Sequence, residues 1–171
     1  MHLYLWRTYS YVENLSFIDC GTPSLHSKYS SALLFSDVTN LMISHVVVQN
    51  TTGFGILRLA LKDSRIYESA LLYNHGDENH LGGNVLILLD DCCSPGNNIS
   101  VSLNIQSTYI LYGDNPHSAD GFPTGLSVAL KRNLCMNTYL VLDNITVSHN
   151  KNGNLTIALS YSATSRASVT I

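Results

Sequence analysis

Short stretches in which apolar and polar residues alternate recur along the chain, each followed by a polar or glycine-containing turn. The clearest copies span residues 40–61 and 140–159, and residues 64–89 form a third with a longer turn. Alternation with a period of two is typical of half-buried β-strands, and no window of useful length shows the 3.6-residue stripe of a helix. An imperfect repeat of this kind indicates a solenoid, whose repeats bury their apolar faces against one another.

Each repeat contains two alternating strands and two different connections, which is how a coil of a parallel β-helix is built. An antiparallel sandwich would instead place hairpins between consecutive strands, for example between residues 46–49 and 57–61. In a β-helix, like residues stack from coil to coil at about 4.8 Å. We therefore expect one set of apolar side chains to face inward in stacked rows: Leu57, Leu59, Val85, Ile87, Leu126, Val128, Leu155 and Ile157.

Asparagines follow equivalent strands in three repeats, at Asn50, Asn74 and Asn150. Either they form part of an internal ladder in which each amide bonds the next, or they are turn-forming residues of the ordinary kind.

The phrase at residues 40–56, NLMISHVVVQNTTGFGI, resembles the repeats of the pectin-lyase-like parallel β-helix superfamily. More closely, residues 12–159 resemble the large extracellular β-helix repeat proteins of simple invertebrates such as sponges. The resemblance implies an all-β fold, a right-handed parallel β-helix of about five coils. Its motifs are degenerate, so it implies the fold far more than any activity.

Composition narrows the function classes. The chain has 171 residues, which is one domain (residues 1–171), and only 12% of them are charged against about 25% in typical proteins. A net charge of −3 without basic clusters does not suit nucleic acid, and no apolar run is long enough to span a membrane. Both ends of the sequence read as uncapped coils cut from a longer polypeptide.

Five N-x-S/T sequons favour an extracellular, glycosylated protein, because a surface with few charges needs another source of solubility. They begin at Asn14, Asn50, Asn98, Asn144 and Asn154. We rank Asn50 and Asn154 first, because they fall at exposed turns, and Asn144 last, because it falls in a strand region, unless its side chain points outward. No secretory signal peptide is visible in the segment. Three of the four cysteines, Cys92, Cys93 and Cys135, fall in adjacent coils, and we expect Cys135 to pair with one of the other two.

The connections sort onto two sides of the predicted coils. Side 1 carries residues 21–31, 51–55, 75–83, 113–125 and 151–154, and side 2 carries residues 36–39, 62–64, 90–98 and 131–138. The two longest side 1 loops belong to neighbouring coils and are rich in carboxylates and histidines. If an ion binds, we expect Ca²⁺ on Asp77, Glu78, Asp114 and Asp120, since Ca²⁺ prefers oxygen ligands. The alternative is that these are ordinary solvated loops.

The sequence favours a non-catalytic structural or adhesive module, with no cofactor required. Its partners would be like subunits or flanking domains at the coil ends. A carbohydrate-active enzyme (lyase, hydrolase or epimerase), or a cation- or glycan-binding module, would use the side 1 loops instead. Near the start, Tyr4, Trp6, Tyr9 and Tyr11 form either a surface patch for sugars or subunits, or a cap on the core of the first coil.

Overall fold

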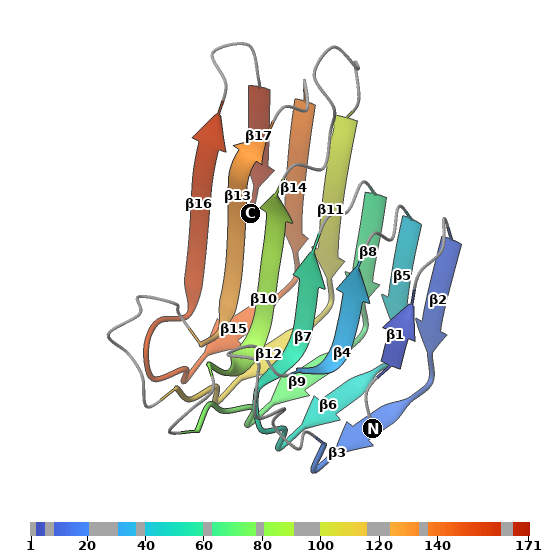
Figure 1. Cartoon of the computed structure of the whole chain (residues 1–171), viewed down its shortest axis with the longest axis vertical. Coiled ribbons are helices and arrows are strands. Elements are labelled where there is room, and N and C mark those ends of the chain that lie inside the picture. Colours follow the sequence, from blue (N-terminus) through green and yellow to red (C-terminus); the bar gives the residue numbers. More distant parts are fainter. Residues whose placement is uncertain are drawn as a thin grey trace.

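The computed structural model shows strands stacked into a solenoid, with neighbouring coils side by side along one axis (Figure 1). The structure describes residues 3–5, 9–20, 31–36, 40–59, 63–77, 81–90, 100–115, 124–133, 137–161 and 166–171. These residues contain seventeen strands in three sheets, and none of the described segments is a helix that could cross a membrane.

Sheets A and B have six strands each, and sheet C has five. Sheet A contains β1 (Leu3–Leu5), β4 (Ser31–Ser36), β7 (Phe54–Leu59), β10 (Gly83–Asp90), β13 (Leu126–Asn133) and β16 (Leu155–Tyr161). Sheet B contains β2 (Tyr9–Glu13), β5 (Asn40–Ser44), β8 (Asp63–Tyr67), β11 (Ser100–Gln106), β14 (Asn137–Asp143) and β17 (Arg166–Thr170). Sheet C contains β3 (Ser16–Ile18), β6 (Val47–Gln49), β9 (Ala70–Leu72), β12 (Tyr109–Leu111) and β15 (Thr146–Ser148).

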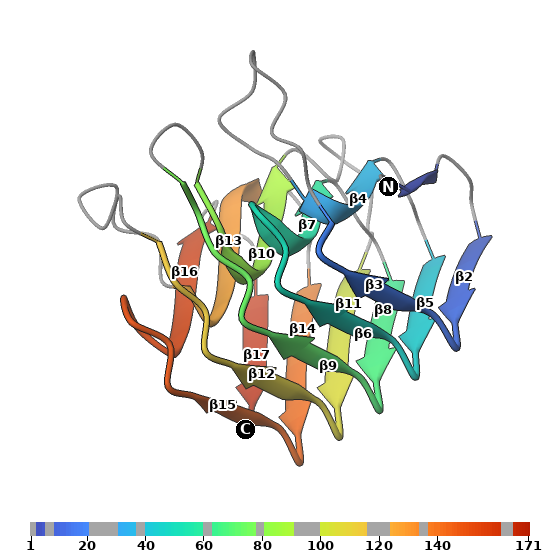
Figure 2. The same cartoon turned by 90° about the horizontal axis from the view of Figure 1, so that it is seen from below.

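Every strand pair is parallel, and the chain visits sheets A, B and C in turn, so each circuit is one coil. This confirms the predicted parallel β-helix of about five coils. Strand β6 pairs with β3 and β9 of the neighbouring coils, whereas a sandwich would have paired it with the next strand along the chain. Figure 2 shows the three sheets from below, with sheet C nearest the reader.

Each coil has three strands, so the prediction of two was wrong. The third arises because a residue with left-handed backbone divides one apparent strand into a sheet B strand and a sheet C strand. These corner residues, with φ between 46° and 54°, are Asn14, His45, Glu68, Ser107 and Asn144. The alternation of side chains continues through the corner, so Val46 and Val48 both point inward, as the pattern indicates.

The core consists of rows of apolar side chains that stack from coil to coil. One row in sheet B is almost fully buried and runs Val12, Ile43, Ile66, Ile105, Leu142. A row in sheet A runs Leu33, Ile56, Val85, Leu126, Leu155. Burying such rows is the main stabilising contribution to a solenoid, at roughly 25 cal/mol per Å² of apolar surface.

The predicted inward rows are correct in three of four coils. Val85, Ile87, Leu126 and Val128 are buried, and Ile157 packs partly against the core. In β7, however, Ile56 and Arg58 lie in register with Val85 and Ile87, so the prediction for Leu57 and Leu59 was one residue out of register. A one-residue slip moves every side chain to the other face of a sheet.

Sheet A also carries a small second apolar cluster, which explains why β7 misled the prediction. Phe54, Leu81 and Leu86 are buried together, with Leu34 partly buried against them. Leu57 lies in register with Leu34 and Leu86, not with the Val85 row. A strand with apolar residues at successive positions does not reveal which of its faces points into the coil.

Candidate functional site

The side 1 connections begin with a corner between sheets C and A. Thr52, His75 and Asp114 occupy equivalent positions in successive coils and form parallel bridges to one another. The backbone continues the pattern, since the Gly76 amide donates to the Asp114 carbonyl at 2.8 Å and the Lys151 amide donates to the Gly113 carbonyl at 3.0 Å. This corner is the point at which the longest connections leave the coils.

Beneath this corner the coils enclose a ladder of four asparagines. The Asn74 amide donates to Asn84 Oδ1 at 2.8 Å, Asn84 donates to Asn150 Oδ1 at 2.9 Å, and Asn150 donates to Asn154 Oδ1 at 3.1 Å. Asn74 and Asn84 are fully buried, and Asn150 is nearly so. The predicted ladder therefore exists, with Asn74 and Asn150 in it as expected.

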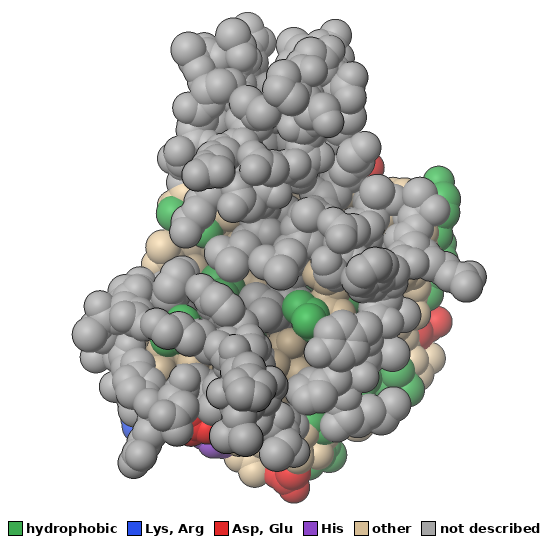
Figure 3. All heavy atoms as spheres, in the orientation of Figure 1, with side chains coloured by type: hydrophobic (Ala, Val, Ile, Leu, Met, Phe, Trp, Pro, Cys, Tyr) green, Lys and Arg blue, Asp and Glu red, His purple; other side chains and the backbone are tan. Residues whose placement is uncertain are grey.

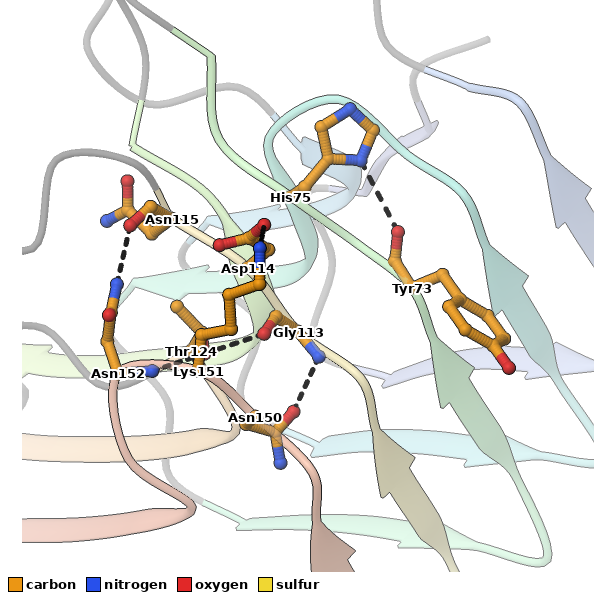
Figure 4. Close-up of polar contacts among 9 residues, drawn as sticks. All are labelled: Tyr73, His75, Gly113, Asp114, Asn115, Thr124, Asn150, Lys151 and Asn152. Atoms are coloured by element: carbon orange, nitrogen blue, oxygen red, sulfur yellow. Dashed lines mark hydrogen bonds and ion pairs between the residues drawn. The ribbon is translucent and has the colours of Figure 1, made fainter.

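Two of the ladder members differ from the prediction. Asn50 lies on the surface, where its amide donates to Asp19 Oδ1 at 2.6 Å. Asn84 takes a central place instead, because the corner equivalent to Asn150 in the preceding coil is Gly113, which has no side chain. The Gly113 amide donates to Asn150 Oδ1 at 2.7 Å, as Figure 4 shows.

Close backbone packing at the corner requires glycine. A Cβ on Gly113 would lie 2.2 Å from the Thr124 carbonyl oxygen and 2.9 Å from Asn150 Oδ1. A Cβ on Gly125 would lie 2.1 Å from the Asn154 carbonyl oxygen. The amides of the ladder therefore occupy the space that side chains at these glycines would need.

Outside the ladder, a second column of left-handed residues has φ between 52° and 58° and runs Asp19, Asn50, Tyr73, Tyr112, His149. The rings of Tyr73 and Tyr112 stack with centroids 4.7 Å apart and planes 3° apart, and His149 stacks on Tyr112 at 5.0 Å. Neither this column nor Asn84 was singled out from the sequence. Because the column mixes Asp, Asn, Tyr and His, no residue type marks it in the sequence.

Of the four predicted ion ligands, Asp77 and Asp114 are described, and Glu78 and Asp120 lie outside the described residues. The Asp114 carboxylate binds Lys151 Nζ at 2.5 Å, and the His75 ring contacts the Tyr73 carbonyl at 3.4 Å (Figure 4). The Lys151 side chain is 71% exposed, so this ion pair contributes at most about 1 kcal/mol to stability. The ion site stays a prediction.

The described part of the chain holds no group of three or more His, Cys, Asp or Glu side chains arranged to hold a metal. In the space-filling view of Figure 3, the acidic side chains of the described residues lie apart on the visible face. The described residues of this corner make amide hydrogen bonds, close backbone contacts and stacked rings.

Several covalent predictions are untested. Cys92, Cys93, Cys135 and Asn98 lie outside the described residues. The other sequon asparagines are exposed, and Asn144 stands at a corner, which is the condition on which its ranking depended; the use of each sequon stays a prediction. Asn154, in contrast, uses its Oδ1 atom to end the internal ladder.

A groove of about 410 Å³ lies on the outer face of sheet B across β2, β5, β8 and β11. Tyr9 and Tyr11 line it and are 67% and 69% exposed, so they form a surface patch and do not cap the core. Asp63, with its Oδ1 accepting from Ser102 at 2.8 Å, and Arg65 lie beside them. The side chains of Tyr4 and Trp6 are not described.

Comparisons with known proteins give no family assignment. No family model matches the chain, and neither a curated protein nor a solved structure matches it. The arrangement of the strands alone therefore places this chain among the parallel β-helices.

Proposed function

We propose that the protein is a non-catalytic structural β-helix module that associates end to end through its C-terminal coil. The observation that carries the proposal is the exposure of inward-facing side chains in that coil. Leu155 is 36% exposed, whereas Val85 and Leu126, its register partners in inner coils, are at most 1% exposed. Ile145, Val147 and Ile157 are likewise only partly buried.

The outermost strands at this end are β16 in sheet A, β17 in sheet B and β15 in sheet C. The outer edge of such a strand offers backbone N–H and C=O groups to another strand, and exposed apolar side chains add to that tendency. A partner that supplies a further coil would satisfy both. A flanking domain of the same polypeptide could supply this coil, and so could a like subunit, because the opposite end presents strands of all three sheets.

In a head-to-tail stack, β1 and β2 of the next subunit would continue sheets A and B beyond β16 and β17. Sheet C would lack one strand at the junction. The order of the coil requires a strand of sheet C after β17, but the next subunit begins with β1, which belongs to sheet A. The contact is therefore incomplete, and we expect weak, concentration-dependent growth. Heterologous contacts of this kind extend without closing unless a rotation closes the ring.

Sedimentation velocity over a range of concentrations tests the proposal on two variants of β16. Leu155→Asp places a charge on the end face, where it would be desolvated by docking, and should weaken growth at least about tenfold. Ala158→Asp is the matched control, because Ala158 is exposed and lies in the opposite register row of the same strand. Equal growth by both variants, or none by the unaltered protein, would contradict end-to-end association.

The proposal includes an extracellular location, which the exposed sequons at Asn14, Asn50 and Asn144 support. On this proposal, residues 40–56 resemble pectin-lyase-like repeats because both form coils of a parallel β-helix, and the resemblance concerns the geometry of the coil. The alternative is a carbohydrate-active enzyme, or a cation- or glycan-binding module, that uses Asp77, Glu78, Asp114 and Asp120 of the side 1 loops.

A further inference from the structure

The outer face of sheet C is free of charge. Its outward side chains, two from each strand, are Ser16, Ile18, Val47, Gln49, Ala70, Leu72, Tyr109, Leu111, Thr146 and Ser148. Ile18 and Tyr109 are each 56% exposed, and the other apolar members are half-buried. The strands lie side by side along the solenoid (Figure 2), so these uncharged side chains, six of them apolar, form one stripe.

The low content of charged residues in the whole chain does not explain why the outer face of sheet C carries no charge. The outer face of sheet B, in the same coils, carries Glu13, Asp63, Arg65 and Asp143. A contiguous apolar patch on one face, bordered by polar corners, is typical of a protein–protein contact. The two corner columns supply that border, with His45 and Glu68 on one side and Asp19 and His149 on the other.

We propose that two copies of the chain associate laterally through their sheet C faces, about a twofold axis that runs parallel to the strands. The axis passes over β9, so that β9 faces β9 of the partner and β3 faces β15 of the partner. Two β-solenoids share the same strand spacing of about 4.8 Å, so their ridges match along the whole stripe. Face-to-face sheets of this kind pack about 10 Å apart.

Side-chain sizes fit this arrangement. It sets Ile18 of each copy opposite Ser148 of the other, and Tyr109 opposite Val47, so a large side chain meets a smaller one at these two pairs. Leu72 meets its own copy, and Gln49 meets Leu111. A twofold axis along the solenoid would instead set Ile18 against Ser16 and Leu72 against Ala70 within the same strands. Both axes therefore give two pairs of unequal size, and the choice of the axis parallel to the strands rests on the border residues.

The border residues fit when the sequons at Asn14, Asn50 and Asn144 carry no glycan, because these asparagines stand in the two corner columns that line the contact. Asp19 and His149 stand at opposite ends of one corner column, so the twofold brings the carboxylate of each copy to the imidazole of the other. The arrangement brings one pair of like charges together, because Glu68 of each copy lies opposite Glu68 of the other. Each Glu68 carboxylate is bound by His45 Nε2 at 2.7 Å, which offsets part of that repulsion.

The stripe covers roughly 240 Å² per copy over the three-residue strands, or about 400 Å² with the two corner columns, from the strand spacing and a rise of about 3.3 Å per residue. A standard stable interface covers about 800 Å² per partner, so the expected dimer is weak and depends on concentration. The contact needs neither end of the solenoid, and it holds whether or not the proposed end-to-end association does. It yields a closed dimer, whereas end-to-end association yields open growth.

The first test compares Leu72→Lys with Val141→Lys by sedimentation equilibrium, after circular dichroism has confirmed that both variants fold. Leu72 lies at the centre of the stripe, where two lysines would meet across the axis. Val141 is a half-buried, outward residue of sheet B and serves as the control. Leu72→Lys should raise the dimer dissociation constant at least tenfold, and Val141→Lys should leave it unchanged.

The second test asks whether the two copies adopt the proposed twofold arrangement, by placing opposite charges at two positions that it brings together. Ile18→Asp and Ser148→Lys should each weaken the dimer, and a chain carrying both should recover it, because the two positions meet only across the twofold. Within one chain they lie at opposite edges of sheet C and cannot pair. Failure of the double variant to recover association, equal association by Leu72→Lys and the control, or a monomer at every concentration would each overturn the proposal. The Leu155→Asp variant should keep the closed dimer, which separates this contact from the end face.

Discussion

Asparagine is used in two ways in this chain, and the surroundings of each side chain decide which. On the surface, Asn14, Asn50 and Asn144 adopt left-handed backbone at corners, a conformation that asparagine tolerates better than most residues. In the interior, Asn74, Asn84 and Asn150 hydrogen-bond through both the carbonyl and the amide group. A buried amide costs little only when its donors and acceptors all find partners.

Asn84 is the member on which the ladder depends most. Its Oδ1 accepts from Asn74, and its Nδ2 donates to Asn150 Oδ1 and to the Leu111 carbonyl at 3.1 Å. Asn84→Ala would remove three hydrogen bonds and leave a buried donor of Asn74 without this acceptor. A buried unsatisfied group costs about 1–3 kcal/mol, so we expect a loss of at least about 2 kcal/mol in the free energy of unfolding, measured by urea denaturation.

Asn104→Ala is the control for this prediction. Asn104 lies in β11 on the outer face of sheet B, and its buried Oδ1 atom has no hydrogen-bond partner among the described residues, so its replacement should lower the free energy of unfolding by no more than about 0.5 kcal/mol. If the two variants lost equal stability, the ladder would contribute no more than an outward-facing amide does.

At the scale of elements, sheet C and its two corners form the constant part of every coil. The corner columns are always five residues apart, while the connections on the other two sides vary in length. The alternation of inward and outward side chains from Val46 to Gln49 could be predicted from the sequence, because the alternation continues unbroken through the corner. The corner itself was not readable, because Glu68, Tyr73 and Tyr112 are unusual residues for left-handed backbone.

Contacts between residues far apart in the sequence explain the other differences from the sequence-based prediction. Apolar residues at successive positions of β7 satisfy both the core and the cluster around Leu86, so only pairing with β10 fixes the register. Asn84 joins the ladder because Gly113 leaves space in the adjacent coil, which is a property of stacking and not of local sequence. Periodicity predicted the parallel coils, and long-range contacts decided the details.

Ser107 tests the corner geometry directly. Its φ of 46° is a conformation that a β-branched residue strongly disfavours. Ser107→Val should therefore be less stable than Ser107→Gly by about 1–2 kcal/mol, measured by thermal or urea unfolding. Ser16→Val is the matched control, because Ser16 is an outward strand residue in register with Val47, and it should be close to neutral. Equal effects of valine at both positions would argue against a left-handed corner.

At the scale of the whole molecule, each coil contacts only its neighbours, so stability is expected to vary along the axis. The free energy of such a solenoid is close to a sum of coil terms and interface terms, and a terminal coil has one interface where an inner coil has two. The exposed side chains of the last coil mark this difference, since Val147 is half-buried while Leu71 and Ile110 in the same row are at most 1% exposed.

Native-state hydrogen exchange offers a matched series of amides for measuring this gradient. The amides of Ala70, Tyr109 and Thr146 occupy the same position after the corner in successive coils and donate to the preceding coil at 2.9–3.0 Å. Because the bonds are equal in length, differences in exchange report the opening of coils. We expect Thr146 to exchange at least about tenfold faster than Ala70 and Tyr109, after correction for intrinsic rates, because the terminal coil opens without disturbing a second interface. Protection of Thr146 should also rise with protein concentration if like subunits cover that end. Equal protection at all three amides in dilute solution would mean that the coils unfold as one cooperative unit, and the gradient would be wrong.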